Sequence, residues 1–194
     1  KTIHMIKQYR NWLRDDTVVS YLFIMIIAIS YLFNLQGGHN WGGDFSMYIM
    51  NALNLLHGEP YAQTGYIYNP DVAFYGPPAY PPVFPLMLTP FLMIWGLNLM
   101  VLKVPGMICL VGILLLFNYR VIPRHLPVLY RVLFLAAFGW NPYLFEILNT
   151  INSDLPFVLF CVISLVLLEQ QNKAQNASKT LAIQYGISGI WMYL

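Results

Sequence analysis

The chain has 194 residues, of which 58% are hydrophobic and only 9% are charged. A soluble globular domain carries about 25% charged residues, so this composition excludes an ordinary soluble domain and predicts an integral membrane protein. The net charge of +2 is small, and the basic residues lie between apolar runs, which argues against a nucleic-acid partner. We expect an all-α fold: a polytopic bundle of membrane helices.

The first apolar run follows a basic, aromatic stretch, residues 1–16, that we expect to form an interfacial helix. Residues 17–35 are 19 residues without a charge, which is enough to cross the hydrocarbon core. This run is longer than a signal-peptide core and no small-residue cleavage site follows it, so we predict a retained span. Residues 36–82 contain three carboxylates but no Lys or Arg. The positive-inside rule then places the N-terminus in the cytoplasm and this loop outside.

The loop contains an amphipathic pattern in residues 41–58, WGGDFSMYIMNALNLLHG. One helical face is apolar and the other is polar; the apolar positions are Phe45, Ile49, Ala52, Leu53 and Leu56, and the polar ones are Ser46, Asn51 and Asn54. Asp44 stands where such a helix is capped, and Gly58 stands where it ends. Asp44 is either a simple cap or a functional carboxylate at the mouth of the helix, just outside a span.

Residues 83–95 allow two topologies. They are 13 apolar residues interrupted by Pro85 and Pro90, a length that suits a re-entrant or interfacial segment better than a span. If the segment crosses the membrane, only five of the ten basic residues are cytoplasmic; if it does not, nine are. The positive-inside rule therefore favours a segment that does not cross.

The remaining spans follow from this choice. We predict spans at about 100–119, 132–147, 155–168 and 180–194, with residues 36–99 as the outer loop. Asp154 then emerges on the same side as Asp44, and Lys103 is the one basic residue there. The last apolar run reaches Leu194 without a flanking charge, so we expect the chain to be the N-terminal part of a longer transmembrane domain. Cys109 and Cys161 lie within apolar runs and are typical of small core residues.

Three segments occur in a suggestive order: GGDFSMYIMNALNLLHGEPY, YGPPAYPPVFPLMLTPF and NSDLPFVLF. In this order the chain resembles the GT-C superfamily of membrane glycosyltransferases, most closely the protein O-mannosyltransferases and the lipid A aminoarabinose transferases. The resemblance implies a GT-C-like bundle with juxtamembrane helices in its first outer loop. It also implies a catalytic carboxylate at Asp44 and a second acidic residue at Asp154. Phe45 stands where many relatives have Glu.

The resemblance further implies transfer of a sugar from a polyprenyl-phosphate-linked donor, a membrane lipid, to an acceptor on the outer, periplasmic or lumenal, face. In a bacterium this would be the cytoplasmic membrane. The site must supply a base for the acceptor hydroxyl and a positive group for the departing phosphate. Asp44 suits the base. Asp154 would hold a divalent cation or orient the acceptor, unless it only caps the helix that begins at Leu155.

Two further residues are candidates for substrate binding. Lys103 would contact the lipid phosphate, although a lysine at a helix end more often snorkels to the interface. Tyr80 precedes a stiff Pro-Pro break that we expect to form one wall of a lipid groove. His39, His57 and Glu59 are weak candidates for metal ligands, so the metal requirement stays open.

Two other functions remain open at this point. Pro and Gly breaks in apolar segments also occur in transporters and channels, although transporters place ionisable residues near the bilayer midplane. A non-catalytic membrane subunit, or a truncated relative without activity, is the other alternative.

Overall fold

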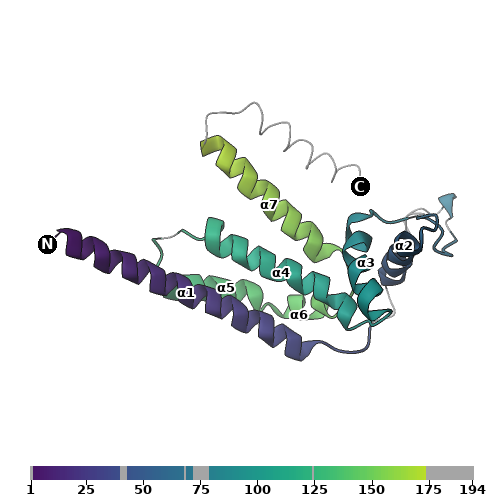
Figure 1. The fold of residues 1–194 in the computed structure, drawn as a ribbon, viewed down its shortest axis with the longest axis horizontal. Helices are drawn as coiled ribbons and strands as arrows, with labels where there is room; N and C mark the ends of the chain where they lie inside the picture. The colour runs from purple at the N-terminus through teal and green to yellow at the C-terminus, as the bar shows by residue number, and fades with distance from the viewer. Residues whose placement is uncertain (1, 40–42, 68, 72–78, 124, 174–194) are drawn as a thin grey trace.

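The computed structural model describes residues 2–39, 43–67, 69–71, 79–123 and 125–173, and within these ranges it contains seven α-helices and no β-strand (Figure 1). The helices are α1 (Thr2–Asn34), α2 (Phe45–His57), α3 (Val83–Trp95), α4 (Val104–Leu116), α5 (Val128–Gly139), α6 (Pro142–Leu148) and α7 (Asp154–Lys173). A 3-10 turn, Val101–Lys103, precedes α4, and a π-helical turn, Phe117–Val121, follows it. The expected all-α class is confirmed.

Three helical segments are long and apolar enough to cross a membrane: Thr17–Asn34, Val101–Val121 and Asp154–Gln171. They lie where the sequence predicts the spans at 17–35, 100–119 and 155–168. A fourth crossing exists if α5 and α6, which meet at a bend of 51°, form one broken span. Three or four such helices are typical of a multi-pass integral membrane protein. The expected span at 180–194 lies outside the described residues.

The N-terminal helix is longer than the sequence suggested. We expected residues 1–16 to form an interfacial helix separate from the span, but α1 runs without interruption from Thr2 to Asn34. Because this stretch contains neither Pro nor Gly, nothing in it breaks the helical hydrogen-bond pattern.

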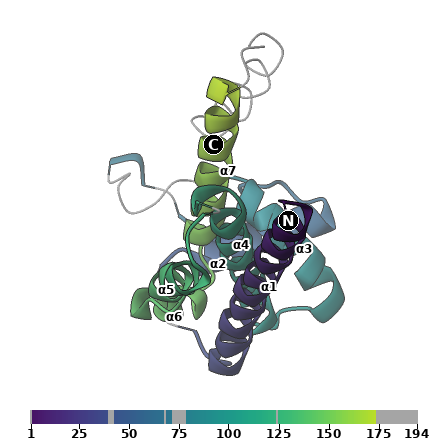
Figure 2. The ribbon, with the colours of Figure 1, turned by 90° about the vertical axis from the view of Figure 1, so that its left-hand side faces the viewer.

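The long helices form a bundle with α4 at its centre. Figure 2 looks along the bundle and shows α1, α5 and α7 around α4, and α1 also packs against α5. The core between them consists of fully buried apolar side chains such as Ile27, Cys109, Ile113, Leu114 and Leu135. The helix α7 contacts α4 and diverges from the rest of the bundle (Figure 1).

The two shorter helices α2 and α3 pack against each other at one end of the bundle (Figure 1). Their shared core contains Phe45, Ala52 and Leu88 and reaches the bundle through Leu102 and Ile151. With 13 residues, α3 is about 20 Å long, which is short of the roughly 30 Å hydrocarbon core. The same end of the bundle holds the last residues of α1 and α6 and the first residues of α4 and α7.

Two of the three polar positions on α2 are buried, which corrects the expectation that Asn51 and Asn54 face away from the core, whereas Ser46 is exposed as expected. Asn51 is 0% and Asn54 is 7% exposed. The Asn54 amide donates to the carbonyl oxygens of Pro60, Tyr61 and Gln63, and that of Asn51 donates to Tyr61 as well. The chain after Gly58, whose φ of 72° ends the helix, therefore folds back over this face.

The span expected as one helix over 132–147 is also corrected, because it is broken between α5 and α6. Pro142 begins α6, and the Tyr143 N–H, which would bond to the Gly139 carbonyl in a continuous helix, donates to the Asn141 side chain instead. The Tyr31 hydroxyl of α1 donates to that Gly139 carbonyl at 2.5 Å. The break is thus tolerated because a neighbouring helix satisfies the freed backbone group.

Replacing Tyr31 by Phe should lower the free energy of unfolding by roughly 1 kcal/mol, because the Gly139 carbonyl loses its donor inside the bundle. Denaturant unfolding of the protein in detergent micelles measures this difference. Tyr21→Phe is the matched control, since Tyr21 lies on the same helix and is exposed. Equal stability of the two variants would contradict this account of the break.

Candidate functional site

Asp44 occupies the N-cap position of α2, but its carboxylate does not act as a cap. Its backbone carbonyl accepts the N–H groups of Met47 and Tyr48, whereas its side chain makes no capping hydrogen bond within the described chain. The carboxylate interacts instead with Tyr80. Burial, a hydrogen bond with Asp44 and the negative charge of that carboxylate all raise the pKa of the Tyr80 phenol. The structure therefore brings two of the predicted site residues together.

Tyr48, one turn after Asp44, links the first outer loop to the turn before α7. Its side chain is 6% exposed, and its hydroxyl shares a hydrogen bond of 3.0 Å with the Ser153 hydroxyl. Its ring centroid lies 4.7 Å from that of Tyr80. Burial raises the pKa of Tyr48, the bond to Ser153 lowers it, and the charges of Asp44 and Asp154 raise it further.

Asp154 is the first residue of α7 and is exposed. Its backbone N–H donates to the Asn152 side chain at 3.3 Å, and the Ser153 carbonyl accepts the N–H of Phe157. A carboxylate in the first turn of a helix is stabilised by the helix dipole, so a structural role is compatible with this position. We call Asp44, Tyr48, Tyr80, Ser153 and Asp154 the carboxylate cluster; it combines two acidic side chains, from two separate loops, with three hydroxyl groups.

Tyr61 fixes the position of Tyr80 within this cluster. The Tyr61 hydroxyl donates to the Tyr80 carbonyl at 2.6 Å, and burial raises its pKa to about 12. The Tyr61 carbonyl in turn accepts from Asn51 and Asn54 on α2. The buried amides of α2 thus hold Tyr61, which holds Tyr80 beside Asp44.

Lys103 lies beneath the start of the outer loop. Its side chain is 1% exposed, and its ammonium group donates to the carbonyl oxygens of Gln36 at 2.7 Å and Gly38 at 2.6 Å. The sequence left two roles open for Lys103: contact with a lipid phosphate, and a lysine at a helix end that snorkels to the membrane interface. This geometry favours a third, structural role, in which the ammonium group anchors the loop.

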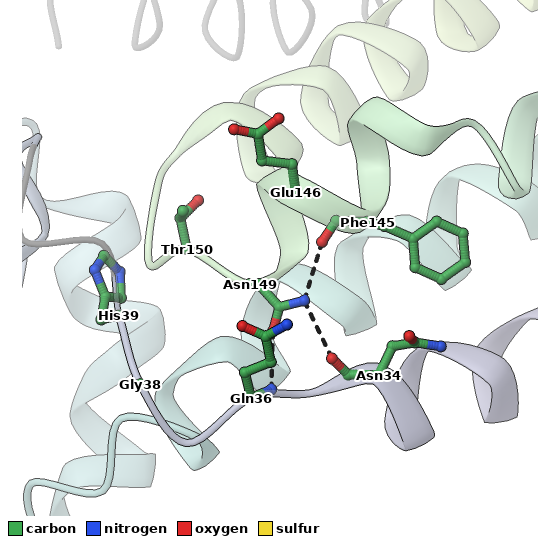
Figure 3. Close-up of a pocket in the computed structure, with 8 residues that line it drawn as sticks. All are labelled: Asn34, Gln36, Gly38, His39, Phe145, Glu146, Asn149 and Thr150. Atoms are coloured by element: carbon green, nitrogen blue, oxygen red, sulfur yellow. Dashed lines mark hydrogen bonds between the residues drawn. The ribbon is translucent and has the colours of Figure 1, made fainter.

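A cavity of about 610 Å³ opens beside the carboxylate cluster, at the same end of the bundle. Two segments face each other across it (Figure 3). One wall is formed by Asn34, Gln36, Gly38 and His39, and the other by Phe145, Glu146, Asn149 and Thr150. Except for His39, a weak metal candidate, these residues were not predicted for the site. Amides scattered over distant segments carry no local motif, so only the fold reveals that they meet.

The cavity and the carboxylate cluster share a boundary at His39. Its ring stacks on Phe45, the residue after Asp44, with centroids 3.9 Å apart. Its Nε2 accepts the backbone N–H of Ile151, two residues before Ser153, at 2.8 Å. His39 thus links the cavity to the two segments that carry the carboxylate cluster.

Among the residues that the structure describes, no group of three or more His, Cys, Asp or Glu side chains could hold a metal ion. Asp44 and Asp154 together would supply two carboxylate ligands to a metal ion. Comparison with models of known protein families, with curated protein sequences and with solved structures gives no match for this chain. A functional assignment therefore rests on the residues and their geometry.

Replacing Asp44 by Asn should lower the pH at which Tyr80 ionises, because the negative charge that favours the protonated phenol is lost. The ionisation of Tyr80 is measured by ultraviolet titration of two proteins, one that keeps Tyr80 and one that also carries Tyr80→Phe. The difference between their curves isolates this tyrosine. Its raised pKa stabilises the fold below about pH 10, and this contribution is lost as the pH rises through the Tyr80 pKa. Asp71→Asn, the same change elsewhere in the loop, should leave the curve in place; an unmoved curve in Asp44→Asn would show that the two side chains do not interact.

Replacing Lys103 by Met should lower the free energy of unfolding by about 1–3 kcal/mol, because the Gln36 and Gly38 carbonyls lose a charged donor. Thermal unfolding without any added lipid donor measures this effect. A variant as stable as the parent that fails to bind a polyprenyl phosphate would instead establish contact with the lipid phosphate.

Proposed function

We propose that this protein transfers a sugar from a polyprenyl-phosphate-linked donor to an acceptor at the outer face of the membrane, as a GT-C-like glycosyltransferase. The observation that carries the proposal is the contact between α2 and the turn before α7: Tyr48, one turn after Asp44, shares a hydrogen bond of 3.0 Å with Ser153, the residue before Asp154. The ordered motifs that resemble the superfamily point to the same two acidic residues.

In the proposed reaction Asp44 is the general base. Its carboxylate takes the proton of the acceptor hydroxyl, the resulting oxygen attacks the anomeric carbon, and the bond from that carbon to the lipid phosphate breaks. The phosphate leaves with the electron pair. The carboxylate suits this role because it is exposed and makes no capping hydrogen bond to α2 within the described chain.

Tyr80 and Asp154 have supporting roles in this proposal. The Tyr80 hydroxyl interacts with Asp44 and orients its carboxylate, and its aromatic ring offers a face for the sugar or the prenyl chain. Asp154 orients the acceptor or, with Asp44, binds a divalent cation that would also contact the phosphate. Two carboxylates with water and phosphate oxygens form a donor set that Mg²⁺ accepts.

The helices α2 and α3 would then be the juxtamembrane helices of the outer loop. The end of α3 supports this placement, because Met93, Ile94 and Trp95 are 67%, 62% and 53% exposed. A row of large apolar side chains on a short helix beside the spans is suited to the lipid interface. The N-terminus would be cytoplasmic, as the charge distribution predicts.

The break between α5 and α6 is the feature that best suits the alternative of a transporter, whose broken helices present backbone groups to a substrate. Here the freed Gly139 carbonyl accepts a hydrogen bond from Tyr31 instead. We therefore prefer the transferase.

The test is consumption of radiolabelled polyprenyl-phosphate sugars by membranes that contain the full reading frame. Asp44→Asn should reduce the rate by roughly 100-fold or more, because it removes the general base, while membrane insertion stays intact. Asp71→Asn is the matched control, an exposed carboxylate in the same loop, and should retain the parent rate.

Two results would contradict the proposal. Undiminished transfer by Asp44→Asn would remove Asp44 from the site. Well-inserted protein that consumes no donor of any sugar type would favour a transporter or an inactive subunit.

A further inference from the structure

We infer that the cavity between the end of α1 and the end of α6 is the acceptor site, and that it takes a neutral, hydroxyl-rich group such as a sugar. The identification of the ligand as the acceptor rests on the proposed function. The binding site itself is inferred from the residues that form the cavity. Its volume of about 610 Å³ lies within the range of about 300–1,000 Å³ that small-molecule sites occupy, so there is room for one or two sugar rings.

The charge of the cavity walls excludes an anionic ligand. Among the described residues that line the cavity, Glu146 is the one carboxylate and none is Lys or Arg. The Lys103 ammonium is already hydrogen-bonded to the Gln36 and Gly38 carbonyls, which belong to one wall. A phosphate or carboxylate would therefore meet a negative charge without a cation to balance it, whereas hydroxyl groups would donate to Glu146.

The walls offer hydrogen-bonding groups that the protein itself does not use. Within the described chain, neither the Glu146 carboxylate nor the Gln36 side-chain amide has a protein hydrogen-bond partner, and both border the cavity (Figure 3). Asn34 uses its amide N–H on the Ser30 carbonyl and keeps its oxygen as an acceptor. The carboxylate can accept hydrogen bonds from the hydroxyl groups of a sugar, and the two amide groups can both accept and donate them.

Four hydrogen bonds hold the wall formed by residues 36–39 in place. The Gln36 N–H donates to the Asn149 side chain at 2.9 Å, and its carbonyl accepts from Lys103. Gly38 also accepts from Lys103, and His39 accepts from the Ile151 N–H. Because hydrogen bonds within the protein fix this wall, binding would lose little conformational entropy.

The position of the cavity suits an acceptor of the proposed reaction. His39 borders the cavity and stacks on Phe45, the residue after Asp44. A sugar in the cavity would thus lie at the same end of the bundle as the proposed base, and a longer acceptor could extend from the cavity past His39 toward Asp44, while the lipid donor approaches from the membrane. A metal ion is a poorer occupant, because among the described residues no cluster of three ligating side chains includes Glu146 and His39.

The experiment is photoaffinity labelling of the full protein in lipid nanodiscs with a methyl hexoside that carries a diazirine. We expect labelled peptides to contain residues 34–39 or 145–150. Free methyl hexoside should compete for labelling, and hexose 6-phosphate should compete much less. Glu146→Ala should reduce labelling roughly tenfold, because hydrogen bonds to a charged acceptor are lost.

Glu59→Ala is the matched control, since Glu59 is also exposed but lies after α2 and away from the cavity, and it should label like the parent. Glu146→Gln should retain labelling within a few-fold, since an amide still accepts hydrogen bonds. Labelling of other segments, or parent-like labelling of Glu146→Ala, would overturn the inference. Loss of labelling in Glu146→Gln, with hexosamine as the stronger competitor, would overturn the neutral ligand in favour of a cation.

The same assay separates this inference from the proposed function. Asp44→Asn should label like the parent, because Asp44 does not line the cavity. Labelling at the cavity in a protein that consumes no donor would leave the binding site standing and remove the transferase. If Glu146→Ala changes neither transfer nor labelling, the transferase would stand and the cavity would not be its acceptor site.

Discussion

Hydrogen bonds from the turn between α6 and α7 join the parts of this molecule that would otherwise be independent. Asn149 bonds to the Gln36 N–H and to the Asn34 carbonyl at the end of α1. Ile151 bonds to His39 in the outer loop, and Ser153 bonds to Tyr48 on α2. Because the turn contacts the bundle, the loop and α2 at once, both the cavity and the carboxylate cluster depend on its position.

The spans could be predicted because their signal is local and strong, since about 20 consecutive apolar residues have few other uses. The breaks in this pattern were harder to predict. The bend between α5 and α6 was missed because the apolar composition continues through it, although Pro142 marks the position. The burial of Asn51 and Asn54 was missed because an amphipathic pattern assumes that the polar face meets water, whereas here residues 60–63 cover it.

The candidate site could be predicted in part, for a topological reason. If residues 83–95 do not cross and α5 and α6 form one broken span, two spans separate Asp44 from Asp154, and the sequence then predicts both acidic residues on the same side of the membrane. The contact of Asp44 with Tyr80, the burial of Lys103 and the cavity around Glu146 depend on where loop backbones turn. Hydrogen bonds between residues more than a hundred positions apart set these turns, and no local pattern encodes them.

The proposed site depends on the contact between α2 and the start of α7, because this contact brings Asp44 and Asp154 to the same end of the bundle. A double-mutant cycle with Tyr48→Phe and Ser153→Ala tests it most directly, because these side chains form the bond between the two segments. Measured as free energies of unfolding in micelles, the cycle should give a coupling energy of about 1 kcal/mol. Strictly additive effects would show that the two segments do not touch, and the shared site would not exist.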